Sequence, residues 1–278
     1  MPAWTYAALF AMVVWSVQRA MSKAVLATLT TPQFYFLSAL ISLPFYVPVL
    51  VADPPPPSAL PGALGVSVLM AVTFGITTEA IRRGPVGRVS PVTGLSPALT
   101  VLLALAILGE RVSLTEATGI VLAMTAVFLL GYRATPDPRR ASWLALALFS
   151  FALQGLGAFL AKVVVTPSGP SRLLVTGAAM QVLVGGYLLR RSGAPFPDIR
   201  PPLMRWAVAV LALAALATIG YLWALSEGPA AVIVPLVATS PALGGLLGAL
   251  VLKERTTRLQ YAAILIGLVG AVLLTLPG

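Results

Sequence analysis

The stretch GPVGRVSPVTGLSPALTVLLALAILGERVSL at residues 84–114 has a second copy in the same chain, GPAAVIVPLVATSPALGGLLGALVLKERTTR at residues 228–258. The two copies align without a gap at an offset of 144 residues. Each has Gly-Pro at its start, Ser-Pro-Ala-Leu in its centre and Glu-Arg near its end. An ungapped match of this length indicates that the chain arose by duplication of a smaller unit.

The composition around these copies is that of a membrane protein. Of 278 residues, 59% are hydrophobic and 9% are charged, whereas a soluble domain has about 45–50% apolar and roughly 25% charged residues. The net charge of +10 would suggest a nucleic-acid partner in a soluble protein. Here the basic residues lie in short loops between apolar runs, so we predict a lipid bilayer and no nucleic acid as the partner.

Ten apolar runs are long enough to cross about 30 Å of hydrocarbon as helices of about 20 residues. Proline-rich or glycine-containing loops separate many of them, such as residues 53–57 and 193–202. We therefore predict an all-α polytopic fold with ten transmembrane helices. The predicted spans are 3–28, 32–52, 59–83, 86–109, 113–132, 142–165, 169–190, 203–226, 229–252 and 256–276.

The duplicated unit contains five of these helices. A tryptophan and a lysine at the start of the chain, Trp4 and Lys23, also recur, at an offset of 139 residues. The predicted repeats are residues 1–134 and 135–278. Because five is an odd number, the two copies must enter the membrane in opposite orientations, which is the usual plan of secondary transporters.

These features resemble the drug/metabolite transporter superfamily, and most closely its ten-helix EamA-type branch. The similarity rests on the five-helix repeats, the Ser-Pro in each fourth helix, and the sequences Leu108-Gly109-Glu110-Arg111 and Leu252-Lys253-Glu254-Arg255. The resemblance implies export or exchange of small metabolites. Amino-acid exporters, including aromatic amino-acid exporters of the YddG type, are well represented in the family.

Helix breaks near the membrane midplane are the expected place for a substrate site. The fourth and ninth spans each contain two prolines six residues apart, and each proline removes a backbone donor and kinks its helix. Ser96 and Ser240 adjoin the central kinks and are candidates to satisfy the freed carbonyls or to bind substrate; simple packing is the alternative. The predicted hinge residues are Pro91, Pro97, Pro235 and Pro241.

Polar and aromatic residues at mid-span extend the candidate site, since a polar group in hydrocarbon needs a partner. Trp15 and Gln154 are equivalent in the two repeats, and we predict that the first stacks on a substrate side chain and the second hydrogen-bonds an amino or carboxyl group. The alternative for each is an interhelical hydrogen bond. The further candidates are Gln18, Thr78, Gln181 and Tyr221, the last equivalent to Thr77.

Charged residues are expected at helix ends. Glu79 precedes Arg82 and Arg83 at helical pairing distance, and Glu110 and Glu254 are expected to cap helices or to form interfacial pairs. Lys23 and Lys162 are expected to snorkel to water or to meet a substrate carboxylate at the mouth of a cavity.

The sequence contains no histidine and no cysteine. We find no phosphate-binding loop, metal cluster or Rossmann fingerprint, so no cofactor and no metal are predicted. Without an evident proton relay, we expect a facilitator or exchanger.

Other functions remain open at this point. A drug or nucleoside exporter of the same architecture is the alternative within transport. An intramembrane enzyme would need a serine and a lysine together at depth, and no triad is evident, so the chain is not predicted to be an enzyme. The oligomeric state is open, with a monomer plausible.

The distribution of basic residues predicts the orientation in a bacterial inner membrane. Ten helices place both termini on one side, and short loops rich in Lys and Arg stay in the cytoplasm. Only Arg111, Lys162 and Arg172 belong to the side of the termini, so we predict both termini outside, although many members of the family are drawn with cytoplasmic termini. The fifteen basic residues of the other side are Arg19, Lys23, Arg82, Arg83, Arg88, Arg133, Arg139, Arg140, Arg190, Arg191, Arg200, Arg205, Lys253, Arg255 and Arg258.

Overall fold

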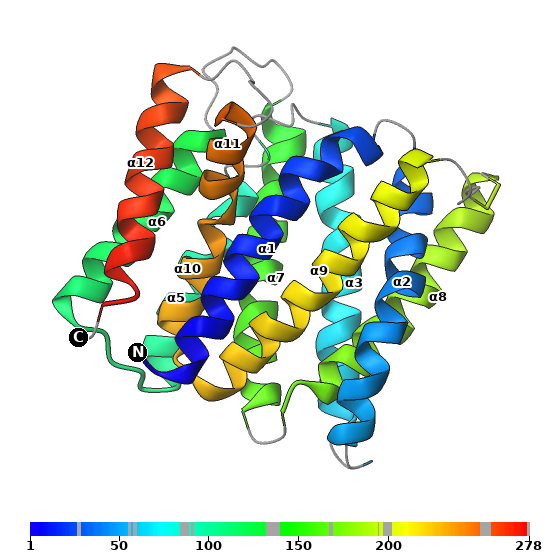
Figure 1. Ribbon diagram of the computed structural model, residues 1–278, viewed down its shortest axis with the longest axis horizontal. Helices are drawn as coiled ribbons and strands as arrows, with labels where there is room; N and C mark the ends of the chain where they lie inside the picture. Colours follow the sequence, from blue (N-terminus) through cyan, green and yellow to red (C-terminus); the bar gives the residue numbers. More distant parts are fainter. Residues whose placement is uncertain are drawn as a thin grey trace.

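The computed structural model is a bundle of upright α-helices (Figure 1). It describes residues 1–26, 29–54, 57, 60–83, 89, 92–131, 140–166, 169–193, 195–196, 202–250 and 257–276. Within these ranges the regular structure is entirely helical, which confirms the predicted all-α fold. The helices are α1 (Ala3–Leu26), α2 (Thr31–Ala52), α3 (Leu60–Arg83), α5 (Ser96–Ile107), α6 (Leu114–Gly131), α7 (Arg140–Val165), α8 (Ser171–Ser192), α9 (Pro202–Glu227), α10 (Ala230–Ala238), α11 (Ser240–Leu250) and α12 (Arg258–Leu273).

These helices correspond to the ten predicted spans, because α10 and α11 together form the ninth. Within the described ranges, six segments are by themselves long and apolar enough to cross a membrane, and four shorter apolar helices accompany them. The predicted boundary between the repeats, at residues 134 and 135, lies outside the described ranges.

The fourth and ninth spans are interrupted at equivalent positions. A turn at Leu95 precedes α5, and Thr239 separates α10 from α11. Each new helix begins with Ser-Pro, where the proline occupies a first-turn position that needs no backbone donor. By contrast, Pro235 lies inside α10 without breaking it, and Pro91 is outside the described part of the chain.

Contacts between helices are related by exchange of the two repeats. The α1–α9 contact has its counterpart in α3–α7, and the contacts of α1 with α10 and α11 have theirs in α5–α7. The α2–α8 and α6–α12 pairs are their own counterparts. This pattern is that of a pseudo-twofold axis between inverted repeats.

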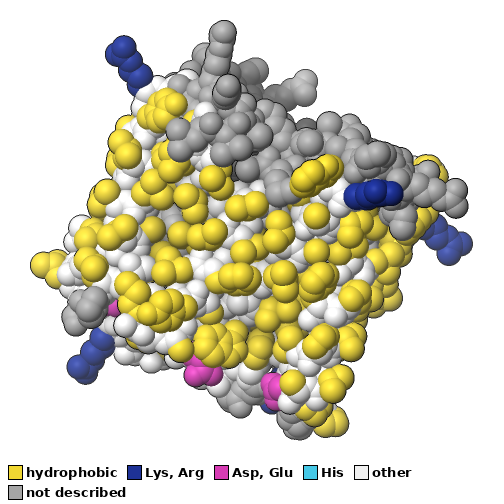
Figure 2. All heavy atoms as spheres, viewed as in Figure 1, with side chains coloured by type: hydrophobic (Ala, Val, Ile, Leu, Met, Phe, Trp, Pro, Cys, Tyr) yellow, Lys and Arg dark blue, Asp and Glu magenta, His cyan; other side chains and the backbone are white. Residues whose placement is uncertain are grey.

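Both termini lie at one end of the bundle (Figure 1). One hollow of about 240 Å³ there is lined by Met1, Pro2, Trp4, Thr5, Glu116, Leu274, Thr275 and Leu276. At the opposite end, Gln33 Nε2 of α2 donates to the Pro195 carbonyl, 2.9 Å away, between α8 and α9. Figure 2 shows hydrophobic side chains over the face between these ends, with the visible charged side chains toward the two ends. This distribution is that of a lipid-facing surface.

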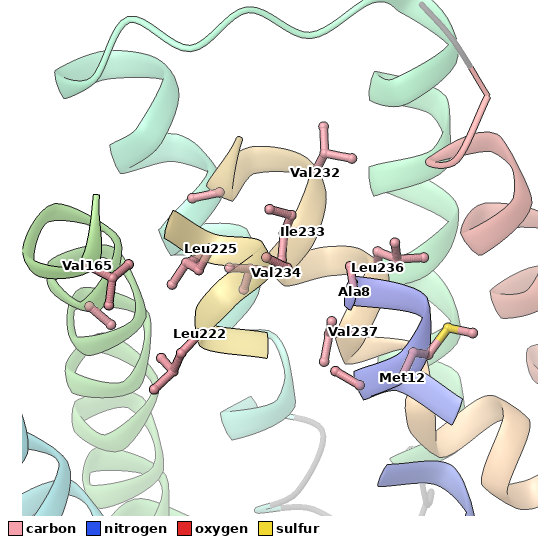
Figure 3. Packing of buried hydrophobic residues seen from close by; sticks show 14 of the residues in the cluster. Ala8, Met12, Val165, Leu222, Leu225, Val232, Ile233, Val234, Leu236 and Val237 are labelled. Atoms are coloured by element: carbon pink, nitrogen blue, oxygen red, sulfur yellow. The ribbon is translucent and has the colours of Figure 1, made fainter. Parts of the chain in front are cut away.

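The core is built around α10, in which Ala230 through Val237 are all buried. Figure 3 shows Leu236 and Val237 beside Ala8 and Met12 of α1, and other α10 side chains near Leu222 and Leu225 of α9. A helix buried on all sides needs an apolar sequence throughout, which explains the composition AAVIVPLVA.

Helices α6 and α12 approach closely through glycine. A Cβ added to Gly270 would lie 2.8 Å from the Ala123 nitrogen and 3.0 Å from the Gly119 carbonyl oxygen. Both of these are backbone atoms, which cannot rotate away. Small residues at such crossings allow the van der Waals contact that holds helices together in lipid.

We expect Gly270→Ala to lower the stability of the protein by about 1–3 kcal/mol, the usual cost of overpacking. The matched control is Gly75→Ala in α3, where an added Cβ meets nothing within 4 Å and helix propensity improves. Thermal unfolding of the purified variants in detergent measures both. Equal midpoints for the two variants would contradict the close α6–α12 contact.

Candidate functional site

A cavity of about 400 Å³ lies between helices of the two repeats. Helices α1, α2, α3 and α5 of the first repeat contribute to its wall, as do α7, α8 and α9 of the second. Its size falls within the usual range for small-molecule sites, roughly 300–1,000 Å³. The lining residues are Trp15, Tyr35, Val66, Ser67, Met70, Ala71, Ser96, Gln154, Gly157, Ala158, Ala161, Leu173, Gly177, Met180, Gln181, Thr218, Tyr221 and Leu222.

The structure brings five of the sequence-predicted residues together in this wall: Trp15, Ser96, Gln154, Gln181 and Tyr221. The remaining three candidates lie elsewhere. Thr78 is exposed and donates to the Phe74 carbonyl of its own helix. Gln18 is half-buried outside the lining, and Ser240 is buried against α1.

Sequence analysis missed several polar and adaptable residues of the wall, among them Tyr35, Ser67, Met70 and Thr218. Ser67 and Thr218 carried the signal used for the other candidates, a polar residue inside an apolar run. Met70 carried none, because methionine is ordinary in a membrane helix.

Aromatic rings form part of the cavity wall. The centroids of the Trp15 and Tyr221 rings are 5.5 Å apart, with the planes tilted by 48°. Tyr35 stacks on Phe74, with centroids 4.4 Å apart and an interplanar angle of 19°. Offset or tilted aromatic pairs at such distances are favourable, and their remaining faces suit contact with an apolar or aromatic ligand.

Hydrogen-bonding groups share the wall with these rings. Gln154 Nε2 of α7 donates to Ser150 Oγ at 2.9 Å and to Thr77 Oγ1 of α3 at 3.3 Å. Ser67 Oγ of α3 lies 2.8 Å from Thr176 Oγ1 of α8. These bonds join the two repeats along the sides of the cavity. No Lys, Arg, Asp or Glu of the described chain belongs to the lining.

Met70 and Gly157 shape the wall between α3 and α7. A Cβ added to Gly157 would lie 3.2 Å from Met70 Sδ, and the Met70 methyl group occupies the remaining space. The repeat equivalent of Gly157 is Gln18, so the second repeat lacks a side chain where the first has one. The flexible Met70 side chain fills that gap, as methionine commonly does.

The helix breaks pack closely against the opposite repeat and hydrogen-bond to it. The Ser16 hydroxyl oxygen of α1 lies 2.6 Å from the Met12 carbonyl oxygen of its own helix and 2.9 Å from the Ser240 carbonyl oxygen, and its one hydrogen is shared between them. Gly155, the repeat equivalent of Ser16, packs against α5, where an added Cβ would lie 2.8 Å from the Ser96 carbonyl oxygen. Thr100 Oγ1 of α5 donates to the Gly155 carbonyl at 3.0 Å.

Comparison with known proteins agrees with this architecture. The model of the EamA-like transporter family matches twice, over residues 2–132 and 141–276. The chain belongs to the EamA-like transporter family. These two matches confirm the two-repeat organisation and the similarity to the drug/metabolite transporter superfamily.

Solved structures share the fold of this EamA-like transporter. Twenty-nine chains of solved structures match this chain in fold. One of them, described only as the crystal structure of a protein, aligns over 98% of this chain and 96% of its own with a TM-score of 0.77 and 16% sequence identity. No curated protein matches the sequence.

The charged residues of this EamA-like transporter serve helix ends. Lys162 differs from the expectation of a snorkelling or substrate-facing cation, because its side chain is buried and its Nζ donates to the carbonyls of Leu225 and Gly228, both at 2.8 Å. Glu110 accepts hydrogen bonds from the backbone N–H groups of Ala230 and Ala231, at 2.9 and 2.8 Å. A cation at the C-terminal end of α9 and an anion at the N-terminal end of α10 complement both helix dipoles.

The remaining charged candidates are local. Arg83 Nε donates to Glu79 Oε1 at 2.7 Å, which confirms the ion pair expected at the end of α3. Glu254 and the side chains of Lys23 and Arg82 lie outside the described part of the chain. Among the described residues, no group of three or more His, Cys, Asp or Glu is placed to hold a metal ion.

We expect Lys162→Met and Glu110→Ala each to lower the thermal unfolding midpoint. A hydrogen bond to a charged group contributes about 1.5–3 kcal/mol, and each variant removes two such bonds from the α9–α10 turn. Arg111→Ala is the control, since Arg111 is an exposed charged residue next to Glu110. If all three variants unfold at the wild-type temperature, the two caps are not structural.

Proposed function

We propose that this EamA-like transporter exports or exchanges small amphipathic metabolites, with apolar and aromatic amino acids as the leading candidates. The observation that carries the proposal is the cavity of about 400 Å³, whose wall combines aromatic rings with uncharged hydrogen-bonding groups. This wall comes from both repeats, as transport between inverted repeats requires.

The lining favours a substrate without net charge. Removing an isolated charge from water into such a cavity is costly unless an opposite charge pairs with it. A zwitterionic amino acid has no net charge, and Gln154 and Gln181 offer hydrogen bonds to its polar end. Trp15, Tyr35 and Tyr221 offer contact area to an apolar or aromatic side chain.

The helix breaks support alternating access as the mechanism. Leu95 and Thr239 lie at repeat-equivalent positions beside the contacts of α5 and α11 with the opposite repeat. Breaks of this kind can act as hinges that absorb changes in backbone angle. The lining contains no carboxylate and no histidine among the described residues, which favours facilitated export or exchange over proton coupling.

Counterflow of labelled phenylalanine into proteoliposomes tests the function. We expect exchange by the wild type and at least a fivefold lower rate for Trp15→Ala. An aromatic side chain packed on another aromatic ring gains roughly 0.5–1.5 kcal/mol of binding free energy beyond that of its buried area. The matched control is Trp206→Ala on α9, where the tryptophan is 61% exposed on the outer surface; its rate should match the wild type.

Counterflow of labelled uridine, or of a lipophilic drug such as ethidium, in place of phenylalanine would support the alternative, a nucleoside or drug exporter. Wild-type rates for a well-folded Trp15→Ala variant would remove Trp15 from the binding site.

We further propose that both termini face outward from a bacterial inner membrane. The end that holds the termini also holds the α5–α6, α7–α8 and α9–α10 connections, and of the basic residues that the structure describes only Arg111, Lys162 and Arg172 belong to it. Asp53, Glu110, Glu116 and Glu227 belong to the same end. The excess of Lys and Arg at the other end favours that end as the cytoplasmic one.

A fusion after Gly278 tests the orientation. A fluorescent protein that matures only in the cytoplasm should stay dark there, and an exported alkaline phosphatase at the same place should be active. The control is the same pair of fusions after Arg83, at the opposite end of the bundle, where the two signals should be reversed. Bright fluorescence after Gly278 with an inactive phosphatase would place the termini in the cytoplasm.

A further inference from the structure

The side-chain amide of Gln154 is held on one side only. Its nitrogen donates to Ser150 Oγ at 2.9 Å, one turn earlier in α7, and to Thr77 Oγ1 of α3 at 3.3 Å. Gln154 is half-buried and lines the cavity. Both N–H groups of the amide therefore have partners in the helix interface, and the oxygen accepts no hydrogen bond from a described residue.

The hydroxyl hydrogens around the amide fix this orientation. Thr77 Oγ1 donates its hydrogen to the Thr73 carbonyl at 2.8 Å. The Ser150 and Thr77 hydroxyl oxygens are themselves within hydrogen-bond distance, so Ser150 must be the donor in that bond. Both hydroxyls then have only lone pairs left for Gln154, and lone pairs accept from the amide nitrogen and not from the oxygen. A flipped amide would set its oxygen against two acceptors.

From this we propose that Gln154 presents its Oε1 to the cavity as a fixed hydrogen-bond acceptor, which selects substrates by an amino or other N–H donor. Thr77 and Ser150 are the positioning residues that hold it so. The inference deepens the proposed function and rests on it for the identity of the cavity as the substrate site. A carboxylate has no hydrogen to offer, so Gln154 disfavours it at this point of the wall.

The same reasoning applies to the other hydroxyl groups near the wall. Their hydrogens are bonded within the protein, so the donors that remain for a substrate belong to other residues. Thr176 Oγ1 donates to the Arg172 carbonyl at 2.9 Å, so Ser67 is the donor in the Ser67–Thr176 bond. Thr218 donates to the Ala214 carbonyl at 2.8 Å. The side chains of Ser96 and Gln181 have no hydrogen-bond partner among the described residues and can donate to a carboxylate. An amino acid therefore meets an acceptor at Gln154 and donors at other points of the wall.

A matched pair of ligands tests the acceptor. Phenethylamine and 3-phenylpropionate share a phenyl ring and a two-carbon chain, and they differ in ending with an ammonium or a carboxylate. Calorimetric titration of the full chain in lipid nanodiscs gives the ratio of their dissociation constants. Because Ser96 and Gln181 can donate to a carboxylate, the change in this ratio is the test. We expect Gln154→Leu to lower the preference for phenethylamine over 3-phenylpropionate about tenfold, the effect of one hydrogen bond to a charged group.

The positioning residues have a test of their own. We expect the double variant Thr77→Val, Ser150→Ala to lower the preference as well, because its amide is free to turn over, whereas Thr77→Ser keeps the hydroxyl and should keep the wild-type ratio. A purely structural role would shift the unfolding temperature or both affinities together and leave the ratio unchanged. The control is Thr78→Val, because Thr78 is next to Thr77 but exposed. This substitution should change the affinity for neither ligand.

The proposal is overturned if the wild type does not bind phenethylamine, or if the ratio is the same in the wild type and in all variants. Failure of the transport proposal gives a different result. A protein that prefers phenethylamine through Gln154 but shows no counterflow of phenylalanine would retain the acceptor and lose the amino-acid substrate.

Discussion

The whole arrangement depends on one constraint, that a backbone carbonyl or N–H group freed inside a membrane must find a partner within the protein. The chain breaks a helix at Thr239 and ends another at Glu227, and each break leaves such groups. Lys162 donates to the carbonyls at the end of α9, Glu110 accepts from the N–H groups at the start of α10, and the Ser16 hydroxyl lies within hydrogen-bond distance of the Ser240 carbonyl beside the break. Ser16 and Glu110 reach across from the opposite repeat, so satisfying the breaks also joins the two halves. A helix break is thus tolerated only where the second copy docks.

Duplication produces such contacts between the two repeats twice. The repeats have since diverged in sequence, so equivalent positions carry different chemical groups. Trp15 and Gln154 are equivalent by the repeat, as are Ser16 and Gly155, and Gln18 and Gly157. One copy therefore offers an aromatic ring where the other offers an amide. In addition, one copy has a glycine where the other has a long side chain, and Met70 fills the space. A strictly symmetric pair would present the same group on both sides of the cavity, whereas this pair presents an apolar and a polar group, which suits an amphipathic ligand.

Much of this was predictable from sequence, since apolar length fixes the spans and an odd number of helices per repeat fixes their inversion. Five lining residues were also predictable, because polar and aromatic side chains at mid-span and a serine beside a helix-breaking proline mark them in the sequence. The rotation of each helix about its axis was not, since these helices are apolar on nearly all faces and lack the stripe that orients an amphipathic helix. Adjacent residues of one helix can therefore differ in exposure. Thr77 supports Gln154 within the bundle, whereas Thr78, about 100° around the same helix, is exposed. The burial of Lys162 was equally hidden, because its partners are backbone carbonyls of a distant helix end.

The charged side chains lie at helix ends and not among the described residues of the cavity lining. The described ionisable groups whose partners are known serve helix ends, as do Lys162, Glu110 and the Glu79–Arg83 pair, and the bias of Lys and Arg serves orientation in the membrane. A lysine within the lining would stay charged only by binding an anion or by keeping water, and either would exclude an apolar ligand from that part of the cavity. Selection in an uncharged cavity must then depend on which groups donate and which accept. The Thr73–Thr77–Ser150 chain of hydrogen bonds orients the Gln154 amide, and the described residues of the lining include no ionised group.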